Sequence, residues 1–373
     1  MKVYLDGIIY SLQSVGGISR YANELILGLS KSQNDIKVLM HRKFYNKPPI
    51  SESKLKFVSI LPTIFKNTLL KYLSYPADQF ITNHLLNKLK ITEGVFHSTY
   101  YTNYSSIKVP MVITVHDLMH EILPDFNNIK SKLFLIKKRQ AIMSADAIIC
   151  ISHNTAKDLL RYYNIDPKKI AIIYNGVSDI FTTKSSSEIL AQFLSTHKIN
   201  APYFLYVGSR KSYKNFNSFI KAFAAWNKNR DYKLVTVGGG NFTLSELAYI
   251  EILGLKNQLI SFSHVSDLDL AILYQGATGF VFPSLYEGFG LPLLEAMSMG
   301  TVVLASDISV FKEIGKDTPI YFNPNDTDSI IEALDLSLKD NEKRIQAGLI
   351  IAKEFSWQKT VAETMNLYKK ISV

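Results

Sequence analysis

PSLYEGFGLPLLEAMSMGTVVLAS, residues 283–306, is the stretch that decides the fold. The apolar strand GFVFP runs directly into it, and a glycine turn then leads to Pro292, which suits the first turn of a helix. Backbone N–H groups at Phe289, Gly290 and Leu291 would open that helix, where the helix dipole favours phosphate. A strand, a glycine turn and a helix in this order predict a parallel α/β sheet with an anion site at the strand end.

Two carboxylates flank this predicted anion site. Glu287 lies in the turn and Glu295 lies one helical turn beyond it. Neither can bind phosphate directly, so hydroxyl groups are their natural ligands. We expect Glu287 to bind sugar hydroxyls and Glu295 to bind ribose hydroxyls. The alternative is an acidic first turn with a solvated glutamate.

The same pattern of strand and helix recurs along the whole chain. Apolar, β-branched runs bounded by Gly, Asn or Asp alternate with helical patterns, which predicts an α/β protein with two doubly wound parallel sheets. The expected strands of the first sheet lie at 2–6, 37–41, 56–60, 94–98, 111–115, 147–152 and 171–175. Those of the second lie at 203–209, 233–239, 259–263, 279–284, 301–306 and 319–323.

A polar, serine-rich stretch separates the two series of strands. We therefore expect an N-terminal domain at 1–180, a linker at 181–200, a C-terminal domain at 201–355 and a final helix at 356–373. Ser356 is a plausible N-cap of that helix. Its apolar stripe needs a partner surface, and consists of Trp357, Val361, Met365 and Tyr368.

Composition and charge narrow the class of protein. The 373 residues are 47% hydrophobic, which suits an ordered chain of two domains, and the single cysteine, Cys150, is expected to be buried and unpaired. Neither an export signal nor a membrane-spanning segment is expected. The net charge of +10 lies entirely in residues 1–185, which hold 24 Lys and Arg against 13 Asp and Glu. A basic excess of this kind raises nucleic acid and anionic membranes as partners.

Two further loops carry candidate site residues. In YVGSRKSYKN, residues 206–215, clustered cations follow a strand and would repel one another unless an anion sits among them, so Arg210 and Lys214 are expected beside a leaving diphosphate. A solvated basic loop is the alternative, and it is the one we expect for Lys211. Gly16 and Gly17 follow the first strand, where paired glycines let backbone approach a ligand.

His116 ends the buried strand MVITV, at the edge where open α/β sheets gather ligand groups. It is the candidate for the residue beside the reacting sugar, and a buried structural histidine fits the same motif equally. His120 has metal-pair spacing with it but lacks a third ligand. Asp267 and Asp269 follow Ser266 in a helix-capping pattern, so no metal site is expected.

Together these motifs resemble the retaining family 4 glycosyltransferases of the GT-B fold. The resemblance is carried by GGISRYANEL, VHDL, SADAIICIS, IIYNGV, the basic loop and EGFGLPLLEAM, which span nearly the whole chain in order. GSRKSYKNF is similar to bacterial enzymes that build O-antigen, capsule or exopolysaccharide, often mannosyltransferases. The basic loop is shorter than in many of these relatives.

The resemblance implies two facing Rossmann-like domains, with the final helix crossing back to the N-terminal domain. It implies metal-independent transfer of a hexose with retention, from a nucleotide diphosphate sugar such as GDP-mannose to a glycan or lipid-linked glycan. Arg210 and Lys214 would neutralise the diphosphate, Glu287 would hold sugar hydroxyls and His116 would orient the sugar. The remaining donor contacts would come from Gly16, Gly17, Val265, Phe289, Gly290, Leu291 and Glu295.

Three rival functions remain open at this stage. A nicotinamide oxidoreductase lacks its fingerprint, since no G-x-G-x-x-G follows the first strand. A nucleic-acid-binding or other non-enzymatic nucleotide-binding regulator would suit the basic half, but no known nucleic-acid motif is legible and no nucleic-acid partner is expected. A GT-B sugar-nucleotide epimerase is the nearest enzyme rival.

The charge distribution also predicts where the protein works. PTIFKNTLLKYL, residues 62–73, would present Phe65, Leu69 and Leu73 beside Lys66 and Lys71, with an ordinary core helix as the alternative. Lysines close by in sequence add charge, namely Lys54, Lys56, Lys88 and Lys90. We expect a cytoplasmic enzyme in peripheral contact with the anionic inner face of the membrane.

Overall fold

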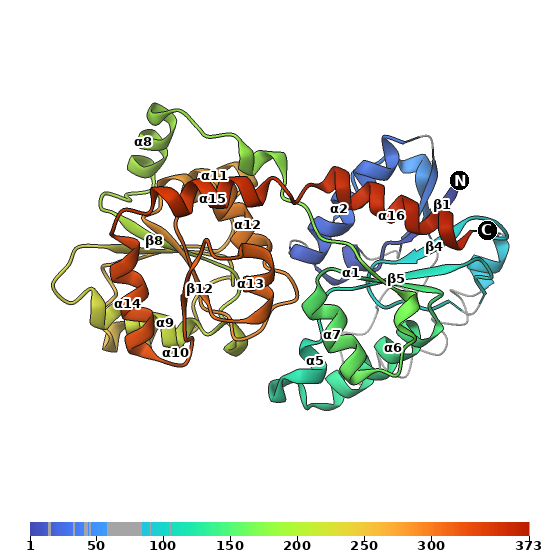
Figure 1. Ribbon diagram of the computed structural model, residues 1–373, viewed down its shortest axis with the longest axis horizontal. Coiled ribbons are helices and arrows are strands. Elements are labelled where there is room, and N and C mark those ends of the chain that lie inside the picture. Colours follow the sequence, from blue (N-terminus) through green and yellow to red (C-terminus); the bar gives the residue numbers. More distant parts are fainter. Residues whose placement is uncertain are drawn as a thin grey trace. The chain divides into compact units, whose positions relative to one another are not determined.

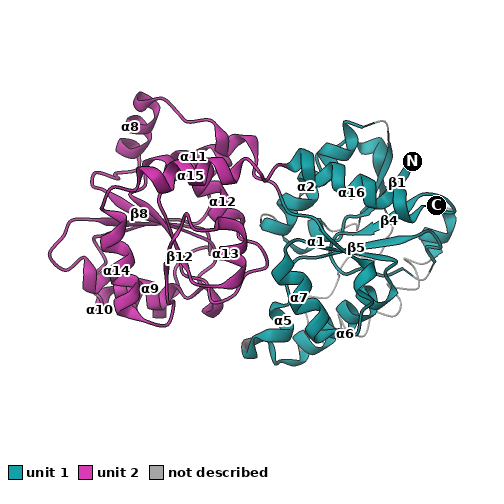
Figure 2. Ribbon diagram, in the orientation of Figure 1, with its two compact units in different colours: residues 1–175, 357–373 teal, residues 176–356 magenta. Residues whose placement is uncertain are grey.

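The computed structural model describes residues 1–13, 16–32, 34–40, 44, 46–57, 84–89, 91–104 and 106–372. These residues form two compact units, coloured separately in Figure 2: unit 1 comprises 1–175 with 357–373, and unit 2 comprises 176–356. The predicted linker at 181–200 lies within unit 2 and contains the helix α8 (Ser187–Thr196). One of the serines that suggested a linker, Ser186, caps this helix, because its side chain accepts a hydrogen bond from the Ile189 amide.

Unit 1 is built on a parallel sheet with the strand order β3-β2-β1-β4-β5-β6-β7. Val3 of the first strand in the chain lies opposite Ile36 on one side and Val95 on the other. Both faces of a parallel sheet must be covered, which explains the uninterrupted apolar runs. The strands are β1 (Lys2–Asp6), β2 (Asp35–Met40), β3 (Leu55–Phe57), β4 (Val95–Ser98), β5 (Met111–Val115), β6 (Ala147–Cys150) and β7 (Ile170–Ile172).

Helices cover both faces of this sheet. Figure 1 shows α2 and α16 on one face, and α6 and α7 on the other. The α-helices are α1 (Ile9–Leu12), α2 (Gly17–Ser30), α5 (Met119–Ile122), α6 (Ile129–Ser144), α7 (His153–Tyr162) and α16 (Trp357–Ile371). Short 3-10 helices are η1 (Glu52–Lys54), η2 (Pro124–Phe126) and η3 (Pro167–Lys169).

Unit 2 repeats this plan with the strand order β10-β9-β8-β11-β12-β13, again all parallel. Its strands are β8 (Tyr203–Val207), β9 (Lys233–Val237), β10 (Leu259–Phe262), β11 (Gly279–Phe282), β12 (Val303–Ser306) and β13 (Ile320–Phe322). The predicted doubly wound architecture is therefore confirmed. Each predicted strand overlaps a strand of the structure.

Helices also cover both faces of the second sheet, with α9, α10 and α14 on one side in Figure 1. The α-helices besides α8 are α9 (Phe216–Trp226), α10 (Leu244–Ile252), α11 (Asp267–Gly276), α12 (Leu291–Ser298), α13 (Ser309–Gly315), α14 (Thr327–Ser337) and α15 (Glu342–Ala352). The 3-10 helices are η4 (Asp179–Thr182) and η5 (Ser212–Lys214).

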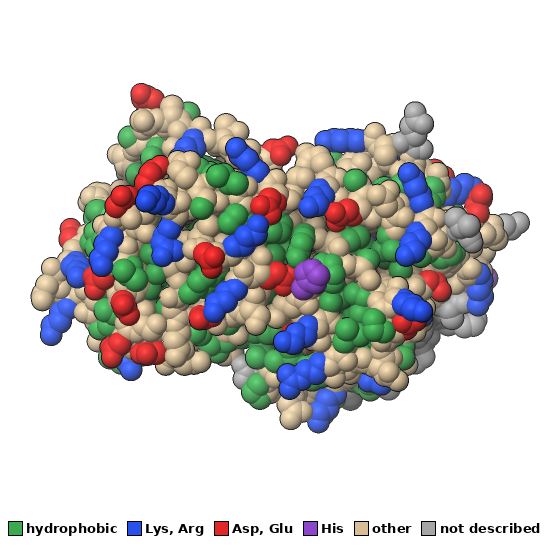
Figure 3. All heavy atoms as spheres, in the orientation of Figure 1, with side chains coloured by type: hydrophobic (Ala, Val, Ile, Leu, Met, Phe, Trp, Pro, Cys, Tyr) green, Lys and Arg blue, Asp and Glu red, His purple; other side chains and the backbone are tan. Residues whose placement is uncertain are grey.

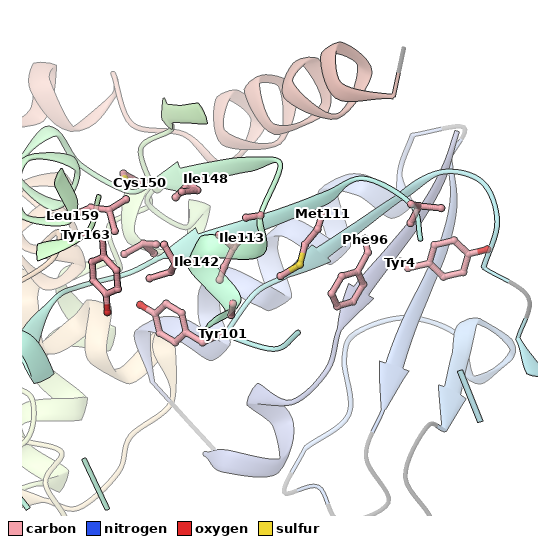
Figure 4. Packing of buried hydrophobic residues seen from close by; sticks show 14 of the residues in the cluster. Tyr4, Phe96, Tyr101, Met111, Ile113, Ile142, Ile148, Cys150, Leu159 and Tyr163 are labelled. Carbon is pink, nitrogen blue, oxygen red and sulfur yellow. The ribbon is translucent and has the colours of Figure 1, made fainter. Parts of the chain in front are cut away.

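The core of unit 1 lies between the sheet and its helices. Figure 4 shows buried residues of this cluster, among them Phe96, Met111 and Ile148 of the strands and Ile142 of α6. Cys150 belongs to this cluster, is free and fully buried, and burial raises the pKa of its thiol to about 12. It is thus a small buried hydrophobe, as predicted.

The final helix, α16, belongs to unit 1 and packs on α2. Trp357 and Tyr368 of the predicted stripe are buried, but Val361 and Met365 lie at its edge. The most buried positions between them are Thr360 and Thr364. Threonine is tolerated there because each hydroxyl donates to a backbone oxygen at 2.7 Å, that of Tyr174 and that of Thr360 respectively.

A buried chain of polar side chains anchors α16 to the sheet. The Tyr368 hydroxyl lies 2.5 Å from Nδ1 of His97 on β4, and Nε2 of His97 lies 2.8 Å from the Thr114 hydroxyl on β5. Tyr21 of α2 completes the chain with a 2.8 Å bond to Thr114. Burial lowers the pKa of His97 to about 3, so the ring is neutral and both of its nitrogens are hydrogen-bonded.

We predict that Tyr368→Phe lowers the free energy of unfolding of unit 1 by about 1 to 3 kcal/mol, because it leaves a buried His97 nitrogen unpaired. Urea unfolding followed by circular dichroism measures the change. Tyr162→Phe, at an exposed position of α7, is the matched control and should change stability much less. Equal effects of the two substitutions would contradict an anchoring role for Tyr368.

Candidate active site

The strand order of unit 2 reverses between β8 and β11, and loops after adjacent strands diverge at such a point. The loop after β8 carries η5, and the loop after β11 leads into α12. They touch directly, since the Leu285 amide donates to the Tyr213 carbonyl at 2.8 Å. The basic loop and the EGFGLP turn, predicted from separate motifs, therefore meet at the switch point where open α/β sheets bind ligands.

Lys214 and Glu287 form an ion pair across these two loops. The lysine Nζ lies 2.5 Å from the glutamate Oε1, and the Ser284 hydroxyl donates to the same oxygen at 2.8 Å. Both charged side chains are largely buried. The two residues expected at the diphosphate and the sugar are therefore neighbours, and their charges balance each other.

Arg210 is fixed against the protein by almost all of its donors. Its Nε donates to Glu246 at 2.8 Å, and the two terminal nitrogens donate to the backbone oxygens of Gly238 and Asn241 at 3.0 Å. The guanidinium also lies 3.9 Å from the ring centre of Phe242, and the side chain is only 4% exposed.

This arrangement corrects one step of the sequence argument. The cations of residues 206–215 were expected to need an anionic ligand between them, but Glu246 and Glu287 supply the counter-charges. The sequence missed Glu246 because it lies 36 positions from Arg210. The feature of the sequence that marks Glu246 is the capping box of α10, in which Thr243 and Glu246 bond reciprocally. A direct contact of Arg210 with a diphosphate stays a prediction.

The start of α12 has the predicted form. Gly290 is its N-cap with φ at +107°, a left-handed conformation that favours glycine, and a Cβ there would lie 3.0 Å from the Phe311 ring. Pro292 stands in the first turn. Phe289 is buried with its ring 6.0 Å from that of Phe355, and Leu291 begins the helix. The turn is therefore rigidly held against its own unit.

Glu295 lies on the inner part of α12 and is only 4% exposed. The hydroxyl of Tyr274, on α11, donates to its Oε2 at 3.1 Å. A hydroxyl is the kind of partner expected for this carboxylate, although here the protein supplies it. The role of Glu295 at a ribose stays a prediction.

The remaining predicted positions of unit 2 lie at the start of α11. Val265 is half-buried directly before Ser266, the N-cap of that helix. The Ser266 hydroxyl oxygen accepts from the Asp269 amide at 3.1 Å, which confirms that Asp267 and Asp269 belong to a capped helix start. Among the residues that the structure describes, no three His, Cys, Asp or Glu side chains gather as metal ligands would.

His116 follows β5 at the carboxyl edge of the sheet of unit 1. It is buried, and its Nε2 lies 2.9 Å from the Thr99 carbonyl oxygen. Because a carbonyl only accepts, Nε2 carries the proton. Burial lowers the pKa of His116 to about 4, so the neutral ring has Nδ1 as an acceptor. His120, which has metal-pair spacing with His116, packs between the rings of Phe126 and Phe134.

A buried acid that is linked to His116 through Thr99 was missed by the sequence analysis. Asp6 ends β1, is fully buried, and accepts from the Thr102 hydroxyl at 2.8 Å and the Ile8 amide at 3.0 Å. Its carbonyl accepts from the Thr99 hydroxyl at 3.0 Å, which connects it through Thr99 to His116. Burial raises the pKa of Asp6 to about 7. The signal was its place at a strand end, where it interrupts an apolar run.

A buried ion pair supports the loop that holds His116. Lys138 of α6 donates to the Asp117 carbonyl at 2.7 Å and pairs with Glu121 at 3.0 Å. Tyr163 donates to the same carboxylate at 2.5 Å. In the sequence Lys138 resembled its exposed lysine neighbours, so only the fold distinguishes it.

The glycine pair opens α2, in the region that follows β1. Gly16 is the N-cap with extended backbone, and a Cβ there would lie 2.9 Å from the side chain of Gln13. Gly17 is the first helical residue. The close approach of Gln13 gives Gly16 a packing reason to lack a side chain, and its contact with a donor stays a prediction.

Comparison with known proteins bears on these sites. The family described as Glycosyl transferases group 1 matches residues 189–349, and Glycosyltransferase Family 4 matches residues 15–180. The O-antigen chain mannosyltransferase B of Escherichia coli is 30% identical over 266 residues, which cover 69% of this chain and 70% of that protein. The chain is a family 4 glycosyltransferase.

One more sequence relative and one solved structure are similar to this glycosyltransferase. The O-antigen chain mannosyltransferase RfbU of Salmonella typhimurium is 33% identical over 220 residues, which cover 58% of each chain. Sucrose-phosphate synthase from Thermosynechococcus elongatus superposes with a TM-score of 0.81 at 18% identity, over 99% of this chain and 98% of that one. The latter likeness concerns the fold, which is GT-B.

We predict that Asp6→Asn stabilises the glycosyltransferase more at about pH 8 than at about pH 5. The pKa of Asp6 rises from 3.8 in the unfolded chain to about 7 in the fold, so the wild type loses stability as pH rises through 7. Asparagine carries no such penalty, and the difference between variant and wild type should grow by about 1 to 3 kcal/mol over this interval.

Urea unfolding at both pH values measures this difference. Asp231→Asn, at an exposed position of unit 2, is the control, and its stability difference from the wild type should be the same at both pH values. A difference for Asp6→Asn that stays constant or shrinks with pH would show that Asp6 is ionised in the fold throughout.

Proposed function

We propose that this glycosyltransferase moves a hexose from a nucleotide diphosphate sugar to a glycan or lipid-linked glycan, with retention and without a metal ion. The observation that carries the proposal is the Lys214–Glu287 pair at the switch point of unit 2, next to the start of α12. An ammonium group and a helix N-terminus suit a diphosphate, and the carboxylate suits sugar hydroxyls.

In this proposal the donor replaces the bond between Lys214 and Glu287. The ammonium turns to the diphosphate, whose negative charge grows as the sugar leaves, and Glu287 accepts hydrogen bonds from the sugar. The donor phosphate oxygen receives the acceptor's proton on the same face, so no protein nucleophile is required. His116, neutral and protonated on Nε2, would accept a sugar hydroxyl at Nδ1.

We further propose mannose as the sugar and GDP-mannose as its donor, for the synthesis of a surface polysaccharide. The support is that two relatives at 30% and 33% identity are named O-antigen chain mannosyltransferases. A sugar-nucleotide epimerase remains the nearest rival, because it would bind the same donor at the same residues of unit 2.

The nucleotide test is a thermal-shift panel of GDP, UDP and ADP, since a ligand that binds the native state raises its apparent stability. We expect GDP to give the largest shift. Incubation of GDP-mannose with and without a glycan acceptor, in excess EDTA, then separates the functions. Transfer in EDTA supports the proposal, isomerised sugar without an acceptor indicates an epimerase, and transfer only after Mg²⁺ is added contradicts metal independence.

We predict that Lys214→Ala lowers kcat by about a hundredfold while changing the acceptor KM little, because its charge complements the leaving group in the transition state. Lys211→Ala, which removes an exposed lysine from the same loop, is the matched control and should keep the wild-type kcat. An unchanged kcat for Lys214→Ala would remove Lys214 from the mechanism.

Arg210→Ala should lower the melting temperature of the protein, because it leaves Glu246 and the backbone oxygens of the 238–241 loop without their donor.

The peripheral membrane contact predicted from residues 62–73 lies outside the described residues, as do Lys66, Lys71 and Lys90. In the part of the chain that the structure describes, no helix is both long and apolar enough to cross a bilayer. The inner face of the membrane as the site of action stays a prediction, and a described surface of unit 1 gives it a separate basis below.

A further inference from the structure

Helix α6 of unit 1 exposes an apolar stripe to solvent. Ile129 is 78% exposed, Ile136 55%, Met143 45% and Leu133 38%. The outer face of a surface helix is ordinarily polar, and single exposed apolar residues need no explanation. Four on one helix do, because exposed apolar residues that gather on one face mark an interaction site.

The four residues lie on one narrow face. With 3.6 residues per turn, they fall within an arc of about 80° around the helix axis, which they share with one exposed polar residue, Gln140. The opposite side of α6 is buried against the unit by Lys138, Ala141 and Ile142. Helix α6 therefore has an inner face that belongs to the core, where Lys138 is buried with Ala141 and Ile142, and an outer apolar stripe that does not.

Positive charge borders the outer stripe on both sides. By the same helical geometry Lys132 and Arg139 flank one edge and Lys137 the other, and all three are exposed. The sequence of α6, IKSKLFLIKKRQAIMS, contains no carboxylate. An apolar stripe flanked by cations is a feature that α6 shares with helices that lie in a membrane interface.

Helix α10 of unit 2 shows that exposure alone does not carry this inference. Its Leu244 is 86% exposed and its Ile252 80%, yet the charged residues of α10 are Glu246 and Glu251, with no cation. Both helices thus expose apolar side chains, and they differ in the charge of the residues beside them, which is positive on α6 and negative on α10.

The charge of each unit agrees with this difference. Unit 1 contains 26 Lys and Arg against 13 Asp and Glu, whereas unit 2 contains 16 against 19. Figure 3 shows cationic and anionic side chains interspersed over much of the face that it draws. On α6, by contrast, the cations adjoin an apolar stripe.

We propose that the outer face of α6 docks on an anionic phospholipid surface. Ile129, Leu133, Ile136 and Met143 enter the boundary between head groups and acyl chains, and the flanking cations meet lipid phosphates. A second copy of the chain is a poorer occupant, since a two-fold contact through α6 would set its cations against themselves. The inference deepens the proposed function, because a lipid-linked acceptor would be presented at such a surface.

The test is sedimentation of the full chain with vesicles of phosphatidylcholine, with or without phosphatidylglycerol. We expect the protein to sediment with the anionic vesicles at low salt and to be released by high salt. Ile129→Ser with Ile136→Ser should weaken the partitioning about tenfold, and Lys132→Glu with Lys137→Glu should weaken it at low salt in particular. Leu244→Ser with Ile252→Ser on α10 is the matched control and should partition as the wild type does.

Each outcome decides the question. Wild-type protein that stays in the supernatant with anionic vesicles overturns the proposal, and so does an α10 variant impaired as much as the α6 variants. A dimer in sedimentation velocity that the α6 substitutions dissociate, without any vesicle binding, would make a second copy the occupant. The nucleotide shift of each variant is measured in parallel, so a failure of docking with nucleotide binding intact is distinct from a failure of the proposed transferase function.

Discussion

Every strand in both sheets runs parallel to its neighbours, so all strands of a sheet end at the same edge. Helices must return the chain across both faces, which makes the strands apolar throughout and leaves polar chemistry to the loops at that edge. In unit 2 this constraint brings Lys214 and Glu287 together, although 73 positions separate them. In unit 1 it brings Asp6, Thr99 and His116 together from the ends of three adjacent strands.

The cations in and near these loops are paired with carboxylates of the protein itself. Arg210 has Glu246, Lys214 has Glu287 and Lys138 has Glu121. Separating a buried pair leaves an uncompensated charge, so a cation changes partner only when another anion replaces the first. Arg210 also holds the backbone oxygens of a glycine loop, and such a rigid set of donors is suited to shaping the loop. The single ammonium of Lys214 is the one better suited to exchange Glu287 for a diphosphate.

The architecture followed from the sequence because its signals are local. Strands 111–115 and 203–207 are continuous apolar runs, and Gly290 with Pro292 marks the start of α12 by backbone chemistry alone. Charge partners were not predictable in this way. Adjacent cations in the basic loop suggested mutual repulsion, whereas the fold supplies carboxylates from 36 and 73 positions away. The helix at 187–196 was missed for a related reason, since a serine-rich stretch serves a linker and an N-cap equally well.

The position of the proton on the His116 ring, and the low pKa of that ring, limit the chemistry that His116 can perform. Its Nε2 proton is held by the Thr99 carbonyl, and its pKa of about 4 keeps the ring neutral near pH 7. A neutral ring in this tautomer accepts at Nδ1 and has no proton to give there, so that nitrogen is suited to accepting a hydrogen bond and not to acting as a general acid. Asp6, with a pKa of about 7, is the neighbouring group that changes charge near neutrality. The Asp6 carboxyl accepts from Thr102 and the Ile8 amide, and only the Asp6 backbone carbonyl bonds to Thr99. A pH dependence near neutrality at this edge would therefore belong to the Asp6 carboxyl and not to the imidazole of His116.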